Sequence, residues 1–327
     1  MRAVLCKAWG GPEDLVVEQV PMPRPGRGEI RVAVEVAGVN FADTLMIAGQ
    51  YQEKPAFPFS PGLECAGVVD ALGDGVDGVA IGDRVMAVAG HGAFAEAAVM
   101  PADRVFPIPD VMPFDIAAAF PVAYGTSHLA LCHRAGLSAG EVLLVHGAAG
   151  GVGLTAVEIG KTVGATVIAT AGGADKLAVA AEYGADHLID YRNEDVRDVV
   201  LRLTGGSGAD VVYDPVGGEV FDASLRCTAW EGRILVIGFA SGKIPSAPVN
   251  RLMVKNFSVL GVYWGAYLAR DPKTVRASFA DLLGWYAAGR LRPHVSRRLP
   301  LERAAEALDM LRARRSTGKV VLTVSGD

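Results

Sequence analysis

The sequence predicts an α/β protein in which a β-rich domain is joined to a doubly wound, six-stranded parallel sheet. Two observations lead to this fold class. Up to about residue 120, short valine-rich segments are separated by Gly, Pro and Asp, as is typical of strands and tight turns. Apolar segments then alternate with helical patterns, which favours parallel strands joined by helical crossovers. A length of 327 residues suits about two domains.

The amino-terminal region predicts a compact all-β or barrel-like unit. Turn signals such as PRPGRG, GDGVDG and IGDR separate its apolar segments. Strands are expected over residues 2–9, 15–20, 29–39, 65–72, 83–89, 94–100 and 104–108.

The central region predicts the parallel sheet. Its strands are continuous apolar runs, which fits strands covered on both faces. They are expected over residues 141–147, 165–172, 187–192, 209–216, 233–240 and 258–264. Helices are expected before the first strand, over 123–136, and between the later ones, over 154–164, 175–184, 194–205 and 219–230.

The last sixty residues break this alternation. Helical patterns cover 271–289 and 301–314, and a final strand is expected over 319–324. A closing strand after the alternating block suggests that the tail returns to the first domain. We therefore expect one domain to comprise residues 1–121 and 267–327, and the other to comprise residues 122–266.

Composition excludes several classes of function. A net charge of −5 without a basic stripe argues against nucleic acid as a partner. No apolar stretch reaches the length of about 18 residues that spans a bilayer, and the amino terminus lacks the apolar core of a signal peptide. Four scattered cysteines without a CxxC pair indicate reduced thiols rather than a disulfide framework or a cysteine-built zinc lobe. We expect a cytoplasmic protein that does not bind membranes.

The stretch GAAGGVGLTA, residues 147–156, lies between the first parallel strand and its helix. Read as A-x-G-x-x-G, it places Ala148, Gly150 and Gly153 at the positions of a dinucleotide-binding turn. Gly150 would let the backbone approach a pyrophosphate, and Gly153 would let the helix pack closely on the strand. Residues 149–152 (Ala149, Gly150, Gly151 and Val152) are therefore predicted to bind the cofactor through the helix amino terminus.

The end of the second parallel strand indicates which cofactor is bound. NAD sites usually have an acidic residue about 20 residues after the glycine turn, which binds the ribose 2′-hydroxyl. Here that strand ends in ATAGG, and the first acid is Asp175, followed at once by Lys176. Arg192 follows the third strand. The missing acid and the nearby cations favour a 2′-phosphate and therefore NADPH, although either cation could instead be an ordinary solvated side chain.

Five stretches now show a resemblance that covers almost the whole chain. The chain resembles the zinc-less quinone oxidoreductase branch of the medium-chain dehydrogenase/reductase superfamily. The stretches are GVNFADTLMIAGQY, PFSPGLECAGVV, VHGAAGGVGLTAVEIGK, GRILVIGFASGKIP and RRSTGKVVLTV. The resemblance implies a GroES-like catalytic domain built from both chain ends, a Rossmann domain between them and a cofactor in the cleft between the domains. It also implies a homodimer joined through the edge of the Rossmann sheet, where residues 258–264 would form the edge strand.

The resemblance also implies that the chain binds no metal. Zinc alcohol dehydrogenases of the superfamily carry a Cys in the segment matching GVNFAD and a His before the Glu of PGLE. This chain has Phe41 and Ala42 in the first segment and Leu63 in the second, and its six histidines form no zinc motif. Without a Lewis acid, a conjugated acceptor such as a quinone suits hydride transfer better than a simple ketone.

Three residues are predicted to be catalytic from the resemblance. Asn40 would orient the substrate or the nicotinamide, although it could equally be a helix cap. Tyr51 would donate a hydrogen bond or a proton to the acceptor oxygen, unless it only packs in its loop. Thr126 matches the family threonine near the nicotinamide and could instead pack its helix. Asp43 and Glu64 are expected to be structural, Glu64 through backbone contacts or an ion pair.

Further cofactor contacts are implied at several positions. Tyr191 is expected near the adenine, and the backbone at Phe239 and Ser241 near the nicotinamide. Arg314 matches the family arginine before TGK that reaches the cofactor phosphates, but neighbouring Arg312 and Arg315 leave that register open. The resulting interpretation is an NADPH-dependent, zinc-independent quinone oxidoreductase. The alternatives are an enoyl-type reductase of 2-alkenals, enones or acryloyl-CoA-like thioesters, and a structural protein that binds the cofactor without turnover.

Overall fold

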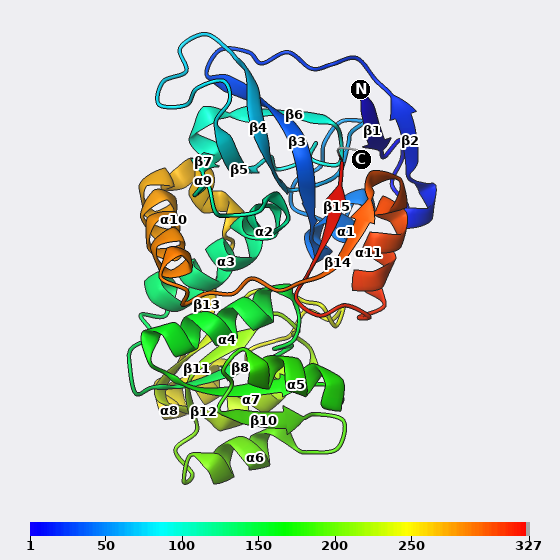
Figure 1. Ribbon diagram of the computed structural model, residues 1–327. Coiled ribbons are helices and arrows are strands. Elements are labelled where there is room, and N and C mark those ends of the chain that lie inside the picture. The colour runs from blue at the N-terminus through cyan, green and yellow to red at the C-terminus, as the bar shows by residue number, and fades with distance from the viewer. Residues whose placement is uncertain (325–327) are drawn as a thin grey trace. The chain divides into compact units, whose positions relative to one another are not determined.

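The computed structural model describes residues 1–324, and the chain divides into two compact units (Figure 1). The first unit comprises Met1–Val122 together with the chain from Pro293 onward, and the second comprises Ala123–Arg292. The sequence placed residues 1–121 and 267–327 in this first domain. The last three residues of the predicted segment 267–327 lie outside the described residues.

The second boundary differs from the predicted one, because residues 267–292 group with the second unit. Helix α10 (Pro272–Ala287) is attached there through its buried face. Ser278 Oγ lies 2.8 Å from His128 Nδ1, and the Trp285 ring lies 5.1 Å from the His128 ring. Phe279 packs edge-on against Trp264 at 6.2 Å. The helical rhythm of the sequence gave no sign of which domain these side chains would cover.

The first unit is built on a mainly antiparallel seven-stranded sheet. The path runs through β14 (Val295–Pro300), β15 (Lys319–Thr323), β3 (Glu29–Val39), β4 (Glu64–Leu72), β5 (Arg84–Val88) and β7 (Val105–Pro107), and β6 (Ala97–Pro101) also pairs with β3. Only β14 and β15 pair in parallel among these strands. A separate two-stranded sheet holds β1 (Arg2–Leu5) and β2 (Val16–Gln19).

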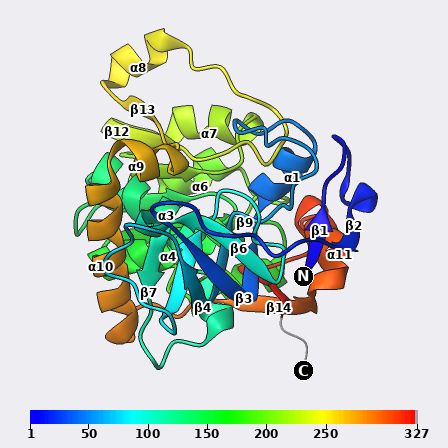
Figure 2. The ribbon, with the colours of Figure 1, turned by 90° about the horizontal axis from the view of Figure 1, so that it is seen from above.

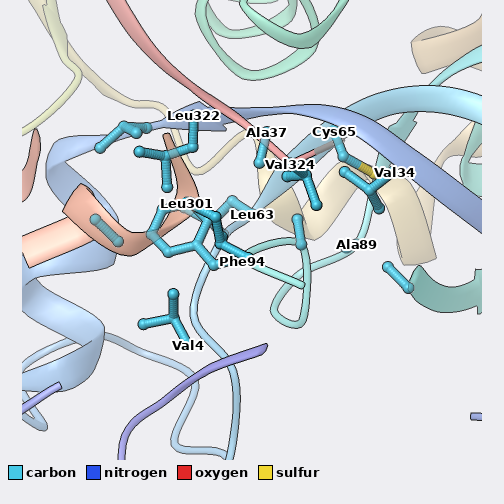
Figure 3. Close-up of a cluster of buried hydrophobic side chains, with 14 of the residues drawn as sticks. Val4, Val34, Ala37, Leu63, Cys65, Ala89, Phe94, Leu301, Leu322 and Val324 are labelled. Carbon is cyan, nitrogen blue, oxygen red and sulfur yellow. The ribbon is translucent and has the colours of Figure 1, made fainter. Parts of the chain in front are cut away.

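The core of the first unit mixes side chains from distant parts of the chain. Val4, Phe94 and Leu322, for example, belong to one buried cluster, together with Leu301 from the carboxyl-terminal segment (Figure 3). The helices of this unit are α1 (Phe41–Ile47), α2 (Phe114–Ala118) and α11 (Ala304–Arg312), with 3₁₀ turns at Pro12–Asp14, Ala102–Arg104 and Leu301–Arg303. Burial of these apolar groups is what brings the tail back to the amino-terminal strands.

The second unit is a parallel six-stranded sheet with the order β10-β9-β8-β11-β12-β13, and the predicted fold class is confirmed. Its strands are β8 (Val142–Val145), β9 (Thr166–Ala171), β10 (His187–Asp190), β11 (Ala209–Asp214), β12 (Thr228–Val236) and β13 (Ser258–Gly261). Its helices include α4 (Gly151–Val163), α5 (Ala174–Glu182), α6 (Val196–Leu203), α7 (Glu219–Cys227) and α9 (Gly265–Arg270).

Both faces of this sheet are covered, as the apolar runs predicted. Leu144 and Val212 point to the side covered by α6 and α7, where they meet Phe221. Leu143 and Val167 point to the other side, where Gly160 of α4 leaves room for them. Helix α3 (Pro121–His128) carries the chain into this unit and continues as a π-helical turn over Leu129–Arg134.

Two elements of the structure have weak sequence signals. Helix α8 (Val249–Lys255) has no buried residue and lies at the side of the sheet that ends in β13 (Figure 2). Strand β14 is an edge strand with two exposed arginines, so it lacks the apolar alternation of a core strand. Within residues 1–324, no helix combines the length and apolar character that a bilayer crossing requires.

Candidate functional site

The glycine turn begins directly after β8. Gly147 has φ of +59°, a left-handed conformation that favours glycine. The N–H of Ala148 donates to the carbonyl of Thr170 at 3.0 Å, which ties the turn to β9. Gly150 caps α4 from an extended conformation, with φ of −82° and ψ of 175°. The residues predicted to meet the cofactor phosphates, 149–152, therefore occupy the amino terminus of a 13-residue helix.

The other two fingerprint positions differ in how much room they have. A Cβ atom on Gly153 would lie 2.2 Å from the Gly147 carbonyl oxygen, so only glycine allows the helix to approach the turn this closely. A Cβ on Gly150 would lie 3.3 Å from the same oxygen. Gly153 is thus required by the fold itself, whereas Gly150 keeps a backbone face uncovered.

A network of buried hydroxyls holds α3 against the start of α4. Ser127 Oγ lies 2.9 Å from the Val152 carbonyl oxygen and 2.8 Å from both Thr155 Oγ1 and Tyr213 OH, and its single proton can point to one of these oxygens at a time. Thr155 Oγ1 also lies 3.2 Å from the Ala123 carbonyl oxygen, a second acceptor for its proton. We call Ser127, Thr155 and Tyr213 the hydroxyl network. It fixes the helix that carries Thr126 relative to the glycine turn.

The ends of β9 and β10 form the second part of the candidate cofactor site. The side chains of Tyr191 and Arg192 lie against the Gly172–Gly173 turn, where a Cβ on Gly172 would be 2.6 Å from Tyr191 OH and 2.9 Å from Arg192 Nε. The nearby acid is Asp190, and its carboxylate accepts the backbone N–H groups of Gly173 and Arg192. This acid is therefore engaged in holding the turn.

Lys176 lies half-buried in the first turn of α5, directly after this turn. The structure thus brings together the predicted contacts Lys176 and Tyr191, and also Arg192, around the carboxyl ends of β9 and β10.

The ends of β11 and β12 form the third part. Asp214, buried at the end of β11, accepts the N–H groups of Val216 and Gly217 at 2.8 and 2.9 Å, so it is a structural turn residue. Ser241 donates its backbone N–H to the Val216 carbonyl at 2.9 Å, which anchors the segment after β12. Phe239 lies on this segment with 37% of its surface exposed. Because β8 and β11 are neighbours, these turns lie at the point where strand order reverses, the usual ligand edge of such sheets.

The first unit contains a buried polar cluster where β3 ends and β4 and β15 begin. Lys319 Nζ donates to Asn40 Oδ1 at 2.6 Å, to Glu64 Oε1 at 2.7 Å and to the Val39 carbonyl at 3.0 Å. Asn40 Nδ2 donates to Glu64 Oε1 at 2.8 Å. Glu64 is fully buried, and Asn40 and Lys319 are each less than a tenth exposed. We call Asn40, Glu64 and Lys319 the lysine cluster.

Asp43 borders this cluster. Its Oδ2 accepts the Asn40 backbone N–H at 2.8 Å, whereas its buried Oδ1 has no hydrogen-bond partner among the described residues. Burial raises the pKa of the Asp43 carboxyl to about 7, against the lowering effect of the Asn40 N–H and the Lys319 ammonium. Asp43 thus caps α1, as a structural role requires, while the Asn40 side chain points to Glu64 and Lys319 instead of capping the helix.

The remaining predicted residues lie in different surroundings. Tyr51 follows α1 and is half-buried against the core of the first unit. Thr126 is half-buried in α3. Arg314 is exposed in the turn after α11 with φ of +54°, a left-handed conformation that is unusual for arginine. Its neighbour Arg312 is paired with Asp309 at 3.0 Å.

Sequence reasoning missed two residues that organise these regions, Lys319 and Ser127. Lys319 belongs to the TGK stretch that carried the resemblance, and a lysine opening an apolar strand is itself unusual. That oddity could have marked it as a buried, partnered charge. Ser127 stands in an ordinary helical stretch, and nothing in the sequence distinguishes it.

Comparison with known proteins gives matches along almost the whole chain. The family model of the alcohol dehydrogenase GroES-like domain matches residues 26–110, and that of zinc-binding dehydrogenase matches residues 151–285. A quinone oxidoreductase-like protein 2 homolog from Nematostella vectensis is 43% identical over 324 residues, covering 98% of this chain and 88% of the relative.

Solved structures also match over the whole length of the chain. A quinone oxidoreductase from Escherichia coli, complexed with NADPH, superposes with a TM-score of 0.93 at 30% identity, covering 99% of this chain and 100% of that one. A 2-haloacrylate reductase superposes with a TM-score of 0.87 at 30% identity, covering all of both chains.

One family name includes zinc, and the residues of this chain do not fit that metal. Within residues 1–324, no three His, Cys, Asp or Glu side chains are grouped so that they could hold a metal ion. Glu64, the acid at the corresponding turn, already has the Lys319 ammonium 2.7 Å away, and a second cation there would be repelled. Leu63 beside it is apolar and buried.

Proposed function

Because this chain belongs to the quinone oxidoreductase branch of the medium-chain dehydrogenase/reductase superfamily and is an oxidoreductase, we propose that it transfers a hydride from NADPH to a quinone without a metal. The observation that carries the proposal is the ligand edge of the second unit. There the glycine turn, the Gly172–Gly173 turn and the segment after β12 line up at the carboxyl ends of parallel strands.

NADPH fits the residues at this edge. The first N–H groups of α4 have no acceptor within the helix and can donate to the pyrophosphate, and Gly150 leaves its backbone uncovered. Arg192 and Lys176 stand near the place where a ribose 2′-phosphate would lie, while Asp190 is engaged with backbone N–H groups. Tyr191 would stack near the adenine, and the Arg314 guanidinium would add a charge for the phosphates.

Bound NADPH supplies the hydride, and the chain supplies placement and hydrogen bonds. We assign Asn40 and Tyr51 as donors to the acceptor oxygen, which gains negative charge when the hydride arrives. Thr126 would hold the nicotinamide end through its hydroxyl, with the backbone of Phe239 and Ser241. In a quinone the new charge is delocalised, so hydrogen bonds can replace a Lewis acid.

A second candidate function is an enoyl-type reductase. The 2-haloacrylate reductase named above shares the fold, and its substrate by name is an activated alkene rather than a quinone. The hydride would then go to the β-carbon of an α,β-unsaturated carbonyl, and the same hydrogen bonds would stabilise the enolate. A cofactor-binding protein without turnover is the remaining alternative.

We further propose that two copies of the chain pair through β13. This strand is the edge of the parallel sheet, and an unpaired edge is a liability. Next to it, α8 and the preceding loop expose large apolar side chains that a second copy would cover: Ile244, Val249, Met253 and Val254, each at least 70% exposed.

We also propose that the chain works in the cytoplasm. Its four cysteines are all free, which suits the reducing conditions there.

The first test is NADPH oxidation, followed by absorbance, against benzoquinones, naphthoquinones, 2-alkenals, cyclic enones and acryloyl-CoA. Fast turnover confined to quinones is expected. A preference for alkenals or the thioester would favour the enoyl-type reductase, and binding without turnover would favour a role other than catalysis. Metal analysis of the same purified protein should find no stoichiometric zinc; one zinc per chain would overturn the metal-free mechanism.

Cofactor choice is tested separately. The chain should bind NADPH much more tightly than NADH. Lys176→Ala and Arg192→Ala should each reduce the ratio of the two affinities about tenfold, the effect of losing one charged contact. Exposed Lys273→Ala on α10 is the matched control and should leave the ratio unchanged. Equal affinity of the unaltered protein for both cofactors would refute the 2′-phosphate assignment.

A further inference from the structure

The lysine cluster is assembled by strand register. In the antiparallel pair of β3 and β15, Val39 lies opposite Val320, so Asn40 and Lys319 occupy the next position at the same end. In the pair of β3 and β4, Gly38 lies opposite Glu64. A Cβ on Gly38 would be 2.5 Å from Glu64 Oε1, so this glycine makes room for the carboxylate. Three segments distant in the chain thus place an amide, a carboxylate and an ammonium together.

Each proton of the Lys319 ammonium has an acceptor, and each oxygen of the Glu64 carboxylate has at least one donor. An ammonium has three protons, and Lys319 donates to three oxygens at 2.6 to 3.0 Å. Glu64 accepts from Lys319 and Asn40 through Oε1, and from the Val122 backbone N–H through Oε2 at 2.7 Å. A charged group with all its partners in place forms a rigid support.

The cluster also fixes the orientation of the Asn40 amide. An ammonium can only donate and a carboxylate can only accept. Rotating the amide by half a turn would place its NH₂ against Lys319 and its oxygen against Glu64, and both contacts would become repulsive. The observed orientation uses one Nδ2 proton on Glu64. The second Nδ2 proton has no acceptor among the described residues, so it is available to a ligand.

We propose that Lys319 is a positioning residue, whose buried ammonium holds the Asn40 amide with one Nδ2–H turned toward the carbonyl oxygen of the electron acceptor. This inference rests on the proposed function, in which Asn40 donates to that oxygen. Lys319 itself does not touch the acceptor. Its contribution is to keep the amide from rotating, so that a donor is present when negative charge develops.

The test separates positioning from simple support of the fold. Lys319→Met removes the ammonium, and Glu64→Gln/Lys319→Met also removes the carboxylate charge, so that no lone buried charge is left. The exposed pair Lys7 and Glu18, 2.6 Å apart in the same unit, gives the matched control Glu18→Gln/Lys7→Met. Each variant is made both in the otherwise unaltered chain and in a chain that also carries Asn40→Ala. Asn40→Ala alone is the reference for the second set. Unfolding in urea shows which variants are folded, and NADPH binding is measured by titration.

The neutral double variant should fold and bind NADPH as the unaltered protein does, but its kcat should fall about a hundredfold, the effect of a misplaced catalytic group. In the Asn40→Ala background the same two substitutions should cause no further loss, because their effect passes through Asn40. The control pair should leave kcat unchanged. Unaltered kcat in the neutral double variant would overturn the proposal. So would an equal loss with and without Asn40.

A second readout does not depend on turnover. In protein labelled with ¹⁵N at asparagine, the Asn40 Nδ2 protons are assigned by comparison with Asn40→Ala. One of the two should exchange slowly with solvent in the unaltered protein, and both should exchange rapidly in the neutral double variant. Unchanged exchange would overturn the proposal. If the unaltered protein reduces no acceptor, the proposed function fails, and the exchange measurement alone decides whether Lys319 positions the amide.

Discussion

The lysine cluster of the first unit and the hydroxyl network of the second both hold elements together, the first through charged groups and the second through neutral hydroxyls. Each joins elements that are distant in the chain, and each is buried. In the hydroxyl network, Ser127 and Tyr213 can each donate to the other, so the direction of the hydrogen bond is not fixed. In the lysine cluster every direction is fixed, because Lys319 only donates and Glu64 only accepts.

This difference shows what a buried ion pair adds. Neutral hydroxyls hold helices in place and tolerate rearrangement of their protons. A charged pair costs more to bury and is strongly destabilising when one partner is removed, yet it imposes one orientation on a neighbouring amide. The first unit uses charge at the place where a side chain must point in one direction. The second uses hydroxyls behind a turn whose ligand contacts are made by the backbone.

The largest effect is expected from Lys319→Met alone. It leaves the Glu64 carboxylate buried without its cation, and the free energy of unfolding should fall by about 3–5 kcal/mol. Urea unfolding measures this, and Glu64→Gln/Lys319→Met should recover most of the loss. If the single substitution were harmless, the cluster would not be the charged support described above.

The next effect concerns pH. The pKa of Asp43 is about 7 in the folded chain, because the carboxyl is buried, and 3.8 ordinarily. Between pH 3.8 and about pH 7, Asp43 is protonated in the folded chain and ionised in the unfolded chain. The resulting stabilisation is complete below pH 3.8 and is lost as pH rises through 7, amounting to roughly 4 kcal/mol.

Urea unfolding of Asp43→Asn across this pH range should lack the decline that Asp43 contributes. Exposed Asp103→Asn is the control and should keep the decline. A decline of the same size in Asp43→Asn would show that another group is responsible.

Gly150→Val tests the backbone-made part of the second unit. The branched side chain would cover the backbone face at the α4 amino terminus, and NADPH affinity should fall at least about a hundredfold, or about 2.7 kcal/mol. Gly284→Val, at a glycine with open space around it, is the control for a valine in a helix of the same unit. Retained NADPH binding in Gly150→Val would mean that the phosphates do not bind at this turn.

The smallest effect is expected from Ser127→Ala. The hydroxyls of Thr155 and Tyr213 remain and can rearrange, so the free energy of unfolding should fall by only about 1 kcal/mol. Urea unfolding of Ser127→Ala and Lys319→Met under the same conditions measures both losses. A loss as large as that of the charged variant would remove the contrast between neutral and charged networks.

Local sequence determined the fold class and most of its elements. Continuous apolar runs predicted the strands of the parallel sheet, since strands covered on both faces need no polar alternation. The glycine turn was predicted from its spacing together with the apolar strand before it and the helical pattern after it, because Gly153 answers a local requirement, the close approach of the helix to the turn. Elements with a weak local signal, such as β14 and α8, were not predicted.

Only the tertiary structure decided which distant residues would meet. The sequence placed helix α10 with the first domain, whereas the structure groups it with the second unit, where Ser278 meets His128, 150 positions earlier in the chain. It named Asn40 as a candidate without indicating Lys319, which stands 279 positions later and donates to its side chain. Periodicity records which face of an element is buried. It does not record the register between strands, and that register is what brings the ammonium, the carboxylate and the amide together.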